Sequence, residues 1–405
     1  MLNRTAQLGL KIEGTEGVEE TLAASDYSGE RKSTSNRFST SRYARATERP
    51  SLSKRPEIAG ARTKNIRWEE ELVGGGAATA APWHTTIRGM GFASTGLKVI
   101  DLGTVTNGPF KVGQIIGNHA TFGSATKTGR VAKYVAGTPG KLYYMPITGT
   151  FADSDTVYNY ASSQGSAPVD STPANAGYAF NPMTETAAAT PPSVTVERRL
   201  GGLRHTIIGA RGTGGLTLRH NEPALINADF QGCPVFDTDG VSPRTGAVVT
   251  SVPDVGAAPR VTKGISVIVR TSGGDFLGTL TMVGINFNNS LAPRPTINSN
   301  DCASSGYKPV RITDREPTAE IDPEMVLPAD GYDIIEYINS GATVELIAEL
   351  GAVTDTNGCI VIWAGAAQHR GDLEPGDRDG ITTSPATLLL TGGNDDELFI
   401  FHIFG

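Results

Sequence analysis

Short runs of alternating apolar and polar residues recur along this chain, and each run is only a few residues long. Near the start, Leu8, Leu10 and Ile12 alternate with polar residues, which predicts an opening strand. Glycine, proline, asparagine and aspartate separate the runs, as expected of turns between strands. Similar patterns predict further strands at 65–72, 194–198 and 204–209, and in GISVIVR, GTLTMVGINF, TVELIAELG and GCIVIWAG.

Two segments are better explained as short helices. Pro82–Phe92, PWHTTIRGMGF, begins with a proline, which the first helical turn tolerates because its missing N–H would be unpaired there. Asp330–Asn339, DGYDIIEYIN, is the other short helix. The pattern as a whole predicts a mainly β protein with short helices.

One part of the chain looks like a separate small module. Phe110–Tyr160 contains four or five short β runs separated by glycine turns, which is typical of a small barrel. Ala161–Pro192 is rich in Ser, Pro and Ala and is interpreted as a return segment. We therefore assign residues 104–180 to an inserted β-barrel-like module.

Outside this module, the order of predicted elements occurs twice. Gly209–Gly232 and Gly376–Gly405 each have a glycine-rich turn, a Thr/Leu strand, a polar hairpin tip, a last strand and a closing glycine. The sequence thus predicts two duplicated β-sandwich or barrel domains. The first covers 1–103 and 181–240, a linker covers 241–259, and the second covers 260–405.

Composition supports many turns and limits the environment of the chain. The 405 residues include 49 glycines and 24 prolines, and the net charge is −7. No run of 18 apolar residues exists, and the N-terminal MLNRTAQLGLKIEG has no signal-peptide pattern, so no membrane association is expected. Cys233, Cys302 and Cys359 are widely spaced, which suggests reduced thiols and neither a disulfide framework nor a zinc site.

Charge is distributed unevenly. The stretch 26–66 is rich in Ser, Thr and Arg and cannot bury a core of its own, so it is predicted to be a long loop that is either functional or disordered. Subunit contact is the favoured role, with nonspecific nucleic-acid binding and plain disorder as alternatives. The residues assigned to a contact between subunits or rings are Arg31, Arg37, Arg42, Arg45, Arg49, Lys54 and Arg55.

The last quarter of the chain is acidic instead. Asp and Glu residues are frequent at 314–349, 372–379 and 395–397. A basic arm and an acidic end on one chain are expected to dock head to tail between copies.

No catalytic constellation stands out. The six histidines have no metal-ligand spacing and no Ser/Asp context, so they are interpreted as surface or packing residues. GARGTGG at 209–215 lacks the ending of a phosphate-binding loop and fits a hairpin turn better. Asp377–Gly380 has only a fragment of a calcium loop. We expect no enzyme activity, no metal and no cofactor.

Several of these segments, in order, resemble the tail tube proteins, or major tail proteins, of long-tailed bacteriophages. The similar segments are LNRTAQLGLKIEGTEG, WEEELVGGGAATAAPWHTTIRGMGF, LYYMPITGTF and the terminus at Gly393–Leu398. The resemblance covers most of the chain outside 104–192. Positions that fall on the family pattern are Glu71, Leu72, Gly74, Gly76, Ala77, Ala81, Pro82, Trp83, Arg88, Gly91 and Phe92.

The resemblance implies a structural role in a virion tail, made in the host cytoplasm. Members of this family are expected to form tube-type β domains with a flanking helix, six of which close a ring. A chain with two such domains would need three copies per ring, with a hexamer as the alternative. Rings would stack through the loop at 26–66, with residues 104–180 outside. Double-stranded DNA would pass through the lumen, and tail terminator, tape measure and distal tail proteins would be partners.

A second function stays open from the sequence alone. A receptor- or carbohydrate-binding tail component would use aromatic side chains to stack on sugar rings. The module contains Tyr134, Tyr143, Tyr144, Tyr158 and Tyr160, which could serve this purpose or fill a core.

Overall fold

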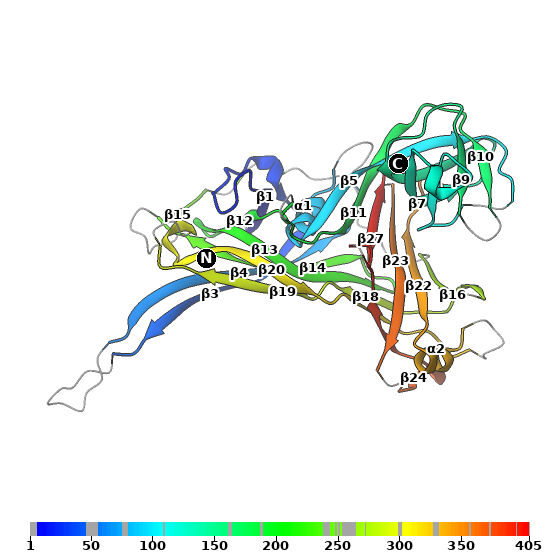
Figure 1. Ribbon diagram of the computed structural model, residues 1–405. Helices are drawn as coiled ribbons and strands as arrows, with labels where there is room; N and C mark the ends of the chain where they lie inside the picture. Colours follow the sequence, from blue (N-terminus) through cyan, green and yellow to red (C-terminus); the bar gives the residue numbers. More distant parts are fainter. Residues whose placement is uncertain are drawn as a thin grey trace.

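Antiparallel strands dominate the computed structural model, and the only two α-helices in its described residues are one to two turns long. Figure 1 shows a central body with a small barrel at one end and a long hairpin projecting at the other. The structure describes residues 6–45, 56–74, 80–107, 110–160, 164–186, 189–237, 244–247, 249, 252, 265–271, 273–298, 302–326, 332–355, 358–371, 374–393 and 395–404.

The first part of the body is a curved sheet built around one long strand, β13 (Leu203–Arg219). Hydrogen bonding joins its strands in the order β2-β1-β12-β13-β14-β4-β3, with every pair antiparallel. β15 (Arg244–Thr245), the described strand within the predicted linker, pairs with the start of β13. The other bounds are β1 Gln7–Ile12, β2 Tyr27–Ser28, β3 Arg31–Tyr43, β4 Ile58–Glu71, β12 Val194–Leu200, β14 Leu225–Val235 and the 3-10 turn Ala24–Asp26.

The second part of the body crosses the first steeply, as β22, β23 and β27 do against β12 to β14 in Figure 1. Here β22 pairs with β16 and β23, and β26 joins β23 to β21. The bounds are β16 Ser266–Thr271, β17 Gly274–Phe276, β18 Met282–Asn286, β19 Asn289–Pro295, β20 Tyr307–Arg315, β21 Thr318–Ile321, β22 Thr343–Leu350, β23 Cys359–Arg370, β24 Gly376–Arg378, β25 Ile381–Thr383, β26 Ala386–Leu390, β27 Phe399–Ile403 and the 3-10 turn Cys302–Ser304.

The two parts share strand pairing and a core. β18 pairs with β13, and β27 pairs with β11 (Ala174–Pro182). One buried cluster includes Trp68 and Phe230 from the first part and Leu346 and Ile362 from the second. The two predicted units therefore do not have separate cores, and neither can be removed without exposing the apolar face of the other.

Both predicted helices are confirmed. α1 (Trp83–Gly89) follows Pro82, and it buries Trp83 and Ile87 completely. α2 (Ile334–Ser340) begins at Asp333, whose side chain accepts hydrogen bonds from the backbone N–H groups of Ile335 and Glu336.

The inserted module closes into a small barrel. Its strands pair in the order β5-β8-β7-β6-β9-β10, and a bridge between Leu102 and Val169 returns the ring to β5. Tyr144, Phe151 and other apolar residues fill the interior. The bounds are β5 Phe92–Leu102, β6 Ile115–Gly117, β7 Thr128–Val135, β8 Gly140–Thr148, β9 Thr156–Asn159, β10 Ser166–Pro168 and the 3-10 turn Phe122–Ser124.

Three segments differ from the sequence prediction. Ala174–Pro182, assigned mostly to the module and its return segment, is strand β11 of the body. The stretch 26–66, predicted to be a loop, contains β3 and most of β4. Asn288–Arg315, whose polar composition also predicts a loop, contains the paired strands β19 and β20. Strands with polar residues on both faces lack the alternation that identifies a half-buried strand, which explains the last two errors.

The two segments with a similar element order also pair differently. In Gly209–Gly232, the strands β13 and β14 pair with each other as a hairpin. In the later segment, β26 and β27 both pair with β23, over different parts of that strand. Their similar element order therefore does not give the same strand arrangement.

Gly177 provides a test of the junction between the two parts of the body. It lies at a register shift in β11 with φ of +146°, and an added Cβ would lie 1.9 Å from the carbonyl oxygen of His402 on β27. We expect Gly177→Ala to lower the free energy of unfolding by about 2–4 kcal/mol. Gly96→Ala, on the adjacent strand β5 with open space around it, is expected to change stability by less than about 0.5 kcal/mol. The free energy of unfolding of both variants can be measured by urea denaturation. Equal losses of stability in the two variants would show that close packing at Gly177 is not required at this junction.

Candidate functional site

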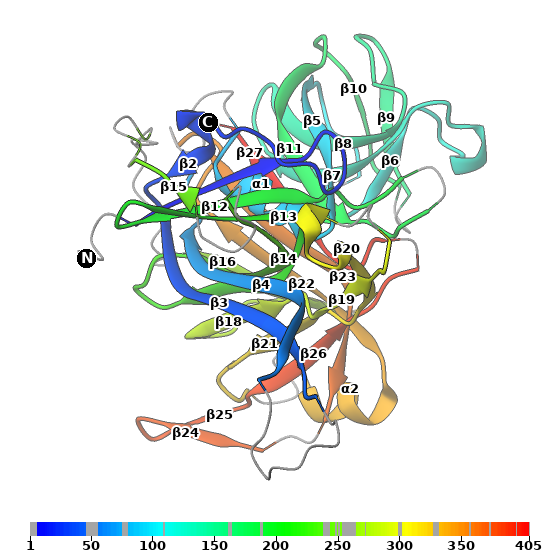
Figure 2. The ribbon, with the colours of Figure 1, turned by 90° about the vertical axis from the view of Figure 1, so that its left-hand side faces the viewer.

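The long hairpin of β3 and β4 extends beyond the sheet that supports it. β14 pairs with β4 only over Lys64–Glu71, whereas β3 accompanies β4 as far as Tyr43 and Ile58. Within the described residues, the outer part is therefore a ribbon of two strands. Figures 1 and 2 both show β3 and β4 leaving the body together on the side away from the small barrel.

This ribbon exposes apolar side chains. Phe38, Tyr43 and Ile58 are 48%, 70% and 53% exposed. Phe38 contacts Phe236 edge-on, with 5.7 Å between ring centroids, but the side chains nearer the tip lie farther from the body. Isolated two-stranded hairpins are marginally stable in water, so a ribbon of this length that exposes large apolar side chains is suited to contact with another surface.

The seven basic residues predicted as contacts fall into three groups. Arg37, Arg42 and Arg45 are exposed on the ribbon, where Arg42 lies 3.8 Å from Glu57. Arg31 is buried and used inside the chain, so its assignment to a surface contact is corrected. The remaining three, Arg49, Lys54 and Arg55, lie outside the described residues.

Arg31 instead anchors the base of the hairpin. Its Nε donates to Glu70 Oε1 at 2.9 Å, and its two terminal nitrogens donate to the carbonyl oxygens of Asp26 and Pro82 at 3.1 and 2.7 Å. Thr86 of α1 donates to the other oxygen of Glu70, which Trp68 Nε1 approaches at 3.5 Å. The buried ion pair thus joins β3, β4 and α1, and these bonds fix the direction of the hairpin.

Many carboxylates of the acidic C-terminal quarter are paired within the chain. The docking of a basic arm on an acidic end was expected to use these groups. Because intrachain partners already neutralise them, the available negative surface is smaller than the sequence suggests. The pairs are Glu316 with Arg370, Asp322 and Glu324 with Arg378, Glu345 with Arg270, Glu349 with Lys133, and Asp395 and Glu397 with Arg315.

The module tyrosines are mostly structural. Tyr143 and Tyr144 are buried, and burial raises the pKa of Tyr144 to about 12. Tyr134 packs on the barrel core. Tyr160 is partly exposed and lies edge-on to Phe122, with 5.1 Å between centroids. A perpendicular pair does not form the flat platform on which a sugar ring stacks, although the two rings line a cavity of about 400 Å³ with Gln114 and Ile115.

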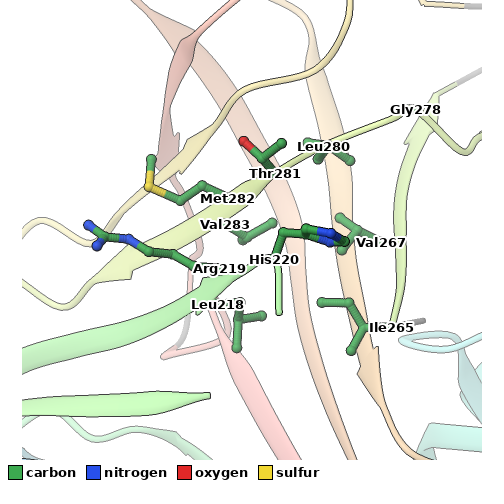
Figure 3. Close-up of a pocket in the computed structure, with 10 residues that line it drawn as sticks. All are labelled: Leu218, Arg219, His220, Ile265, Val267, Gly278, Leu280, Thr281, Met282 and Val283. Carbon is green, nitrogen blue, oxygen red and sulfur yellow. The ribbon is translucent and has the colours of Figure 1, made fainter. Parts of the chain in front are cut away.

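A small cavity of about 140 Å³ lies where the two parts of the body meet (Figure 3). It lies between the end of β13, β16 and β18. In Figure 3 Leu218, Ile265 and Val267 surround it beside the His220 ring, while Arg219 and Met282 point away from it. The residues that line this cavity do not form an arrangement of nucleophile, base and oxyanion donor.

Other reactive side chains within the described part of the chain have structural positions. All three cysteines are buried, and no group of three His, Cys, Asp or Glu side chains could hold a metal ion. His84 Nε2 lies 2.8 Å from His402 Nδ1 in the core, where burial, His402 and Arg88 lower the pKa of His84. Neither helix is long and apolar enough to cross a membrane.

No protein-family model matches the sequence, and a search of curated proteins finds no match.

The hairpin anchor yields a first prediction for this region. Glu70→Gln leaves the charge of Arg31 buried without its carboxylate, so we expect the free energy of unfolding to fall by about 3–5 kcal/mol. Glu69→Gln is the matched control, because Glu69 is partly exposed and lies 3.9 Å from Lys32. In chemical denaturation, Glu69→Gln should lower the free energy of unfolding by less than about 0.5 kcal/mol. Similar losses in the two variants would refute the anchoring role.

His369 yields a second prediction, on pH. Burial lowers its pKa from 6.5 to about 4, and Tyr332 Oη lies 2.6 Å from its Nε2. The unfolded chain therefore binds a proton more readily than the folded chain below pH 6.5, and stability falls as pH falls toward 4. We expect His369→Gln to reduce this loss by roughly 1–3 kcal/mol in denaturation at stepwise pH. His119→Gln, at an exposed position, should keep the wild-type slope.

Proposed function

We propose that this protein is a structural subunit that assembles into stacked hollow rings, as a tail tube protein of a long-tailed bacteriophage does. The observation that carries the proposal is the β3–β4 hairpin, which is anchored by a buried ion pair and exposes apolar residues beyond the body. A ribbon with a fixed direction and a few exposed apolar side chains is suited to insertion against a neighbouring copy. The resemblance in sequence assigns this segment to ring stacking.

The edge of β3 supports contact between copies. In the described residues β3 pairs with β4 alone, which leaves a row of backbone donors and acceptors along its other side. The corresponding first strand of the second hairpin, β18, has its outer side covered by β13. We infer that a strand of another copy covers β3 in the same way, since unpaired edges of this length favour association.

The order of elements supports a duplicated tube domain. In the first part the β3–β4 hairpin precedes α1 and β5. In the second part, β18 and β19 run into β20 and β21 as one interrupted hairpin, which precedes α2 and β22. Two such units in one chain favour a ring of three copies with pseudo-sixfold symmetry, and six copies is the alternative. DNA would pass through the lumen, and the barrel module would lie outside.

A sugar- or receptor-binding tail component is the second candidate. The cavity beside Phe122 and Tyr160 at the exposed end of the module favours it. Burial of Tyr143 and Tyr144 removes most of the aromatic surface on which this function would depend.

Trimming the hairpin tests the assembly function. The variant replaces residues 41–61 with an Asn-Gly turn, because Thr40 and Arg62 lie directly opposite each other and such a turn closes a two-residue hairpin. We expect the purified wild type at high concentration to form hollow tubes in electron micrographs, and the trimmed variant to give rings or single particles that do not stack. Its thermal midpoint should stay within about 2 °C of wild type, because the ribbon lies outside the core.

Phe122→Ser is the control, since it removes an exposed aromatic of the module and should leave tubes intact. Tubes of normal length from the trimmed variant would reject the stacking role. A wild type that stays as discrete particles and binds glycans through Phe122 would shift the function to the second candidate.

A further inference from the structure

Three basic side chains converge on one face of the first sheet, at the rim of the core. Lys64 on β4 lies in the same row as Ile66 and Trp68, which are buried in the core. Arg198 on β12 is directly opposite His205 on β13 in the strand register. Each of the three is close enough to another to perturb its ionisation electrostatically.

The three have no acidic partner in the described residues. Lys64 is only 6% exposed, and in the described residues no hydrogen bond or ion pair reaches its ammonium group. Arg198 and His205 are half-buried, and Arg198 Nε is buried without an acceptor. On the opposite face of the same strands, by contrast, Glu197 neutralises Arg199 and Arg204. The basic side chains on one face of these strands therefore have a carboxylate partner, whereas Lys64 and Arg198 on the other face have none in the described residues.

Such an arrangement is costly unless something compensates it. Buried charges in proteins are normally paired, and like charges close together destabilise the fold. Burial, together with Arg198, lowers the pKa of Lys64 to about 8. Burial, Lys64 and Arg198 lower the pKa of His205 to about 4. At neutral pH this leaves two cations and one neutral imidazole, all with hydrogen-bond donors, on one face of the sheet, where Arg198 and His205 are partly exposed.

We propose that Lys64, Arg198 and His205 form an oxyanion-binding site. Lys64 forms its floor as a point charge, Arg198 supplies a planar fork suited to two oxygens, and the His205 ring donates one further hydrogen bond. Carboxylate and phosphate share the required chemistry. The two sources are a side-chain carboxylate of a second copy of this chain and a free inorganic oxyanion.

Thermal unfolding of the dilute, unassembled protein tests the site. Millimolar inorganic phosphate, compared with chloride at equal ionic strength, is expected to raise the unfolding midpoint of the wild type by about 2 °C. Lys64→Met should lose this rise and should be at least as stable as wild type without phosphate, because the repulsion with Arg198 is removed. Lys32→Met, an exposed cation on the same hairpin, should keep the rise.

The proposed site is rejected if phosphate does not raise the unfolding midpoint of the wild type, or if it still raises that of Lys64→Met. The pH dependence provides a second readout, which does not depend on the fold of the variant. The phosphate-induced shift in the wild type should shrink as pH rises through about 8, where Lys64 loses its proton. A shift that persists unchanged well above that pH also overturns the proposal.

Assembly kinetics distinguish the two sources. If phosphate slows wild-type assembly and Lys64→Met assembles slowly regardless of phosphate, the site holds a carboxylate of the second copy. If phosphate binds and assembly does not respond, the occupant is the free oxyanion. Because the binding assay uses unassembled protein, its result is independent of whether the chain builds tubes.

Discussion

Two strand pairings join the halves of this chain, β13 with β18 and β11 with β27, and the remaining architecture depends on them. Backbone donors and acceptors in a sheet must be satisfied, and these pairings satisfy the inner edges of both halves with each other. The apolar faces that result bury Trp68, Phe230, Leu346 and Ile362 in one cluster. With the inner edges satisfied in this way, the sheet keeps an open edge along β3, at the base of the projecting hairpin.

Hydrophobic patterning predicted the parts of the fold that have a buried side. The opening strand and both helices have residues with one apolar face, and all three were predicted correctly. The outer part of the β3–β4 ribbon is largely exposed, so its Ser, Thr and Arg residues gave no periodic signal. The pairing of strands distant in sequence could not be predicted either. No local sequence pattern specifies that β11 lies between β5 and β27.

Charge counts identified an unusual segment but not the roles of its members. Arg31 and Lys64 belong to the same basic stretch as Arg37 and Arg42, yet both are buried and only the latter pair lies on the exposed ribbon. The sequence spacing alone could have indicated that Lys64 is buried, since Lys64 lies on the same face of β4 as the buried residues Ile66 and Trp68. The partners of Arg31 come from Glu70 and from the turn before α1, so its role depends on tertiary structure.

The barrel module shares one strand with the body, and this has a mechanical consequence. β5 pairs with β11 of the body over its first half and with β8 of the barrel over its second half. A continuous strand, and not a flexible linker, thus connects the barrel to the body. The orientation of the barrel relative to the body is therefore fixed. Its entry and exit, at Leu102 and Val169, lie side by side. A different barrel would have to keep this spacing between its ends. It would also have to keep the apolar cluster in which Tyr143 and Met145 of the barrel join Trp363, Phe399 and Phe401 of the body.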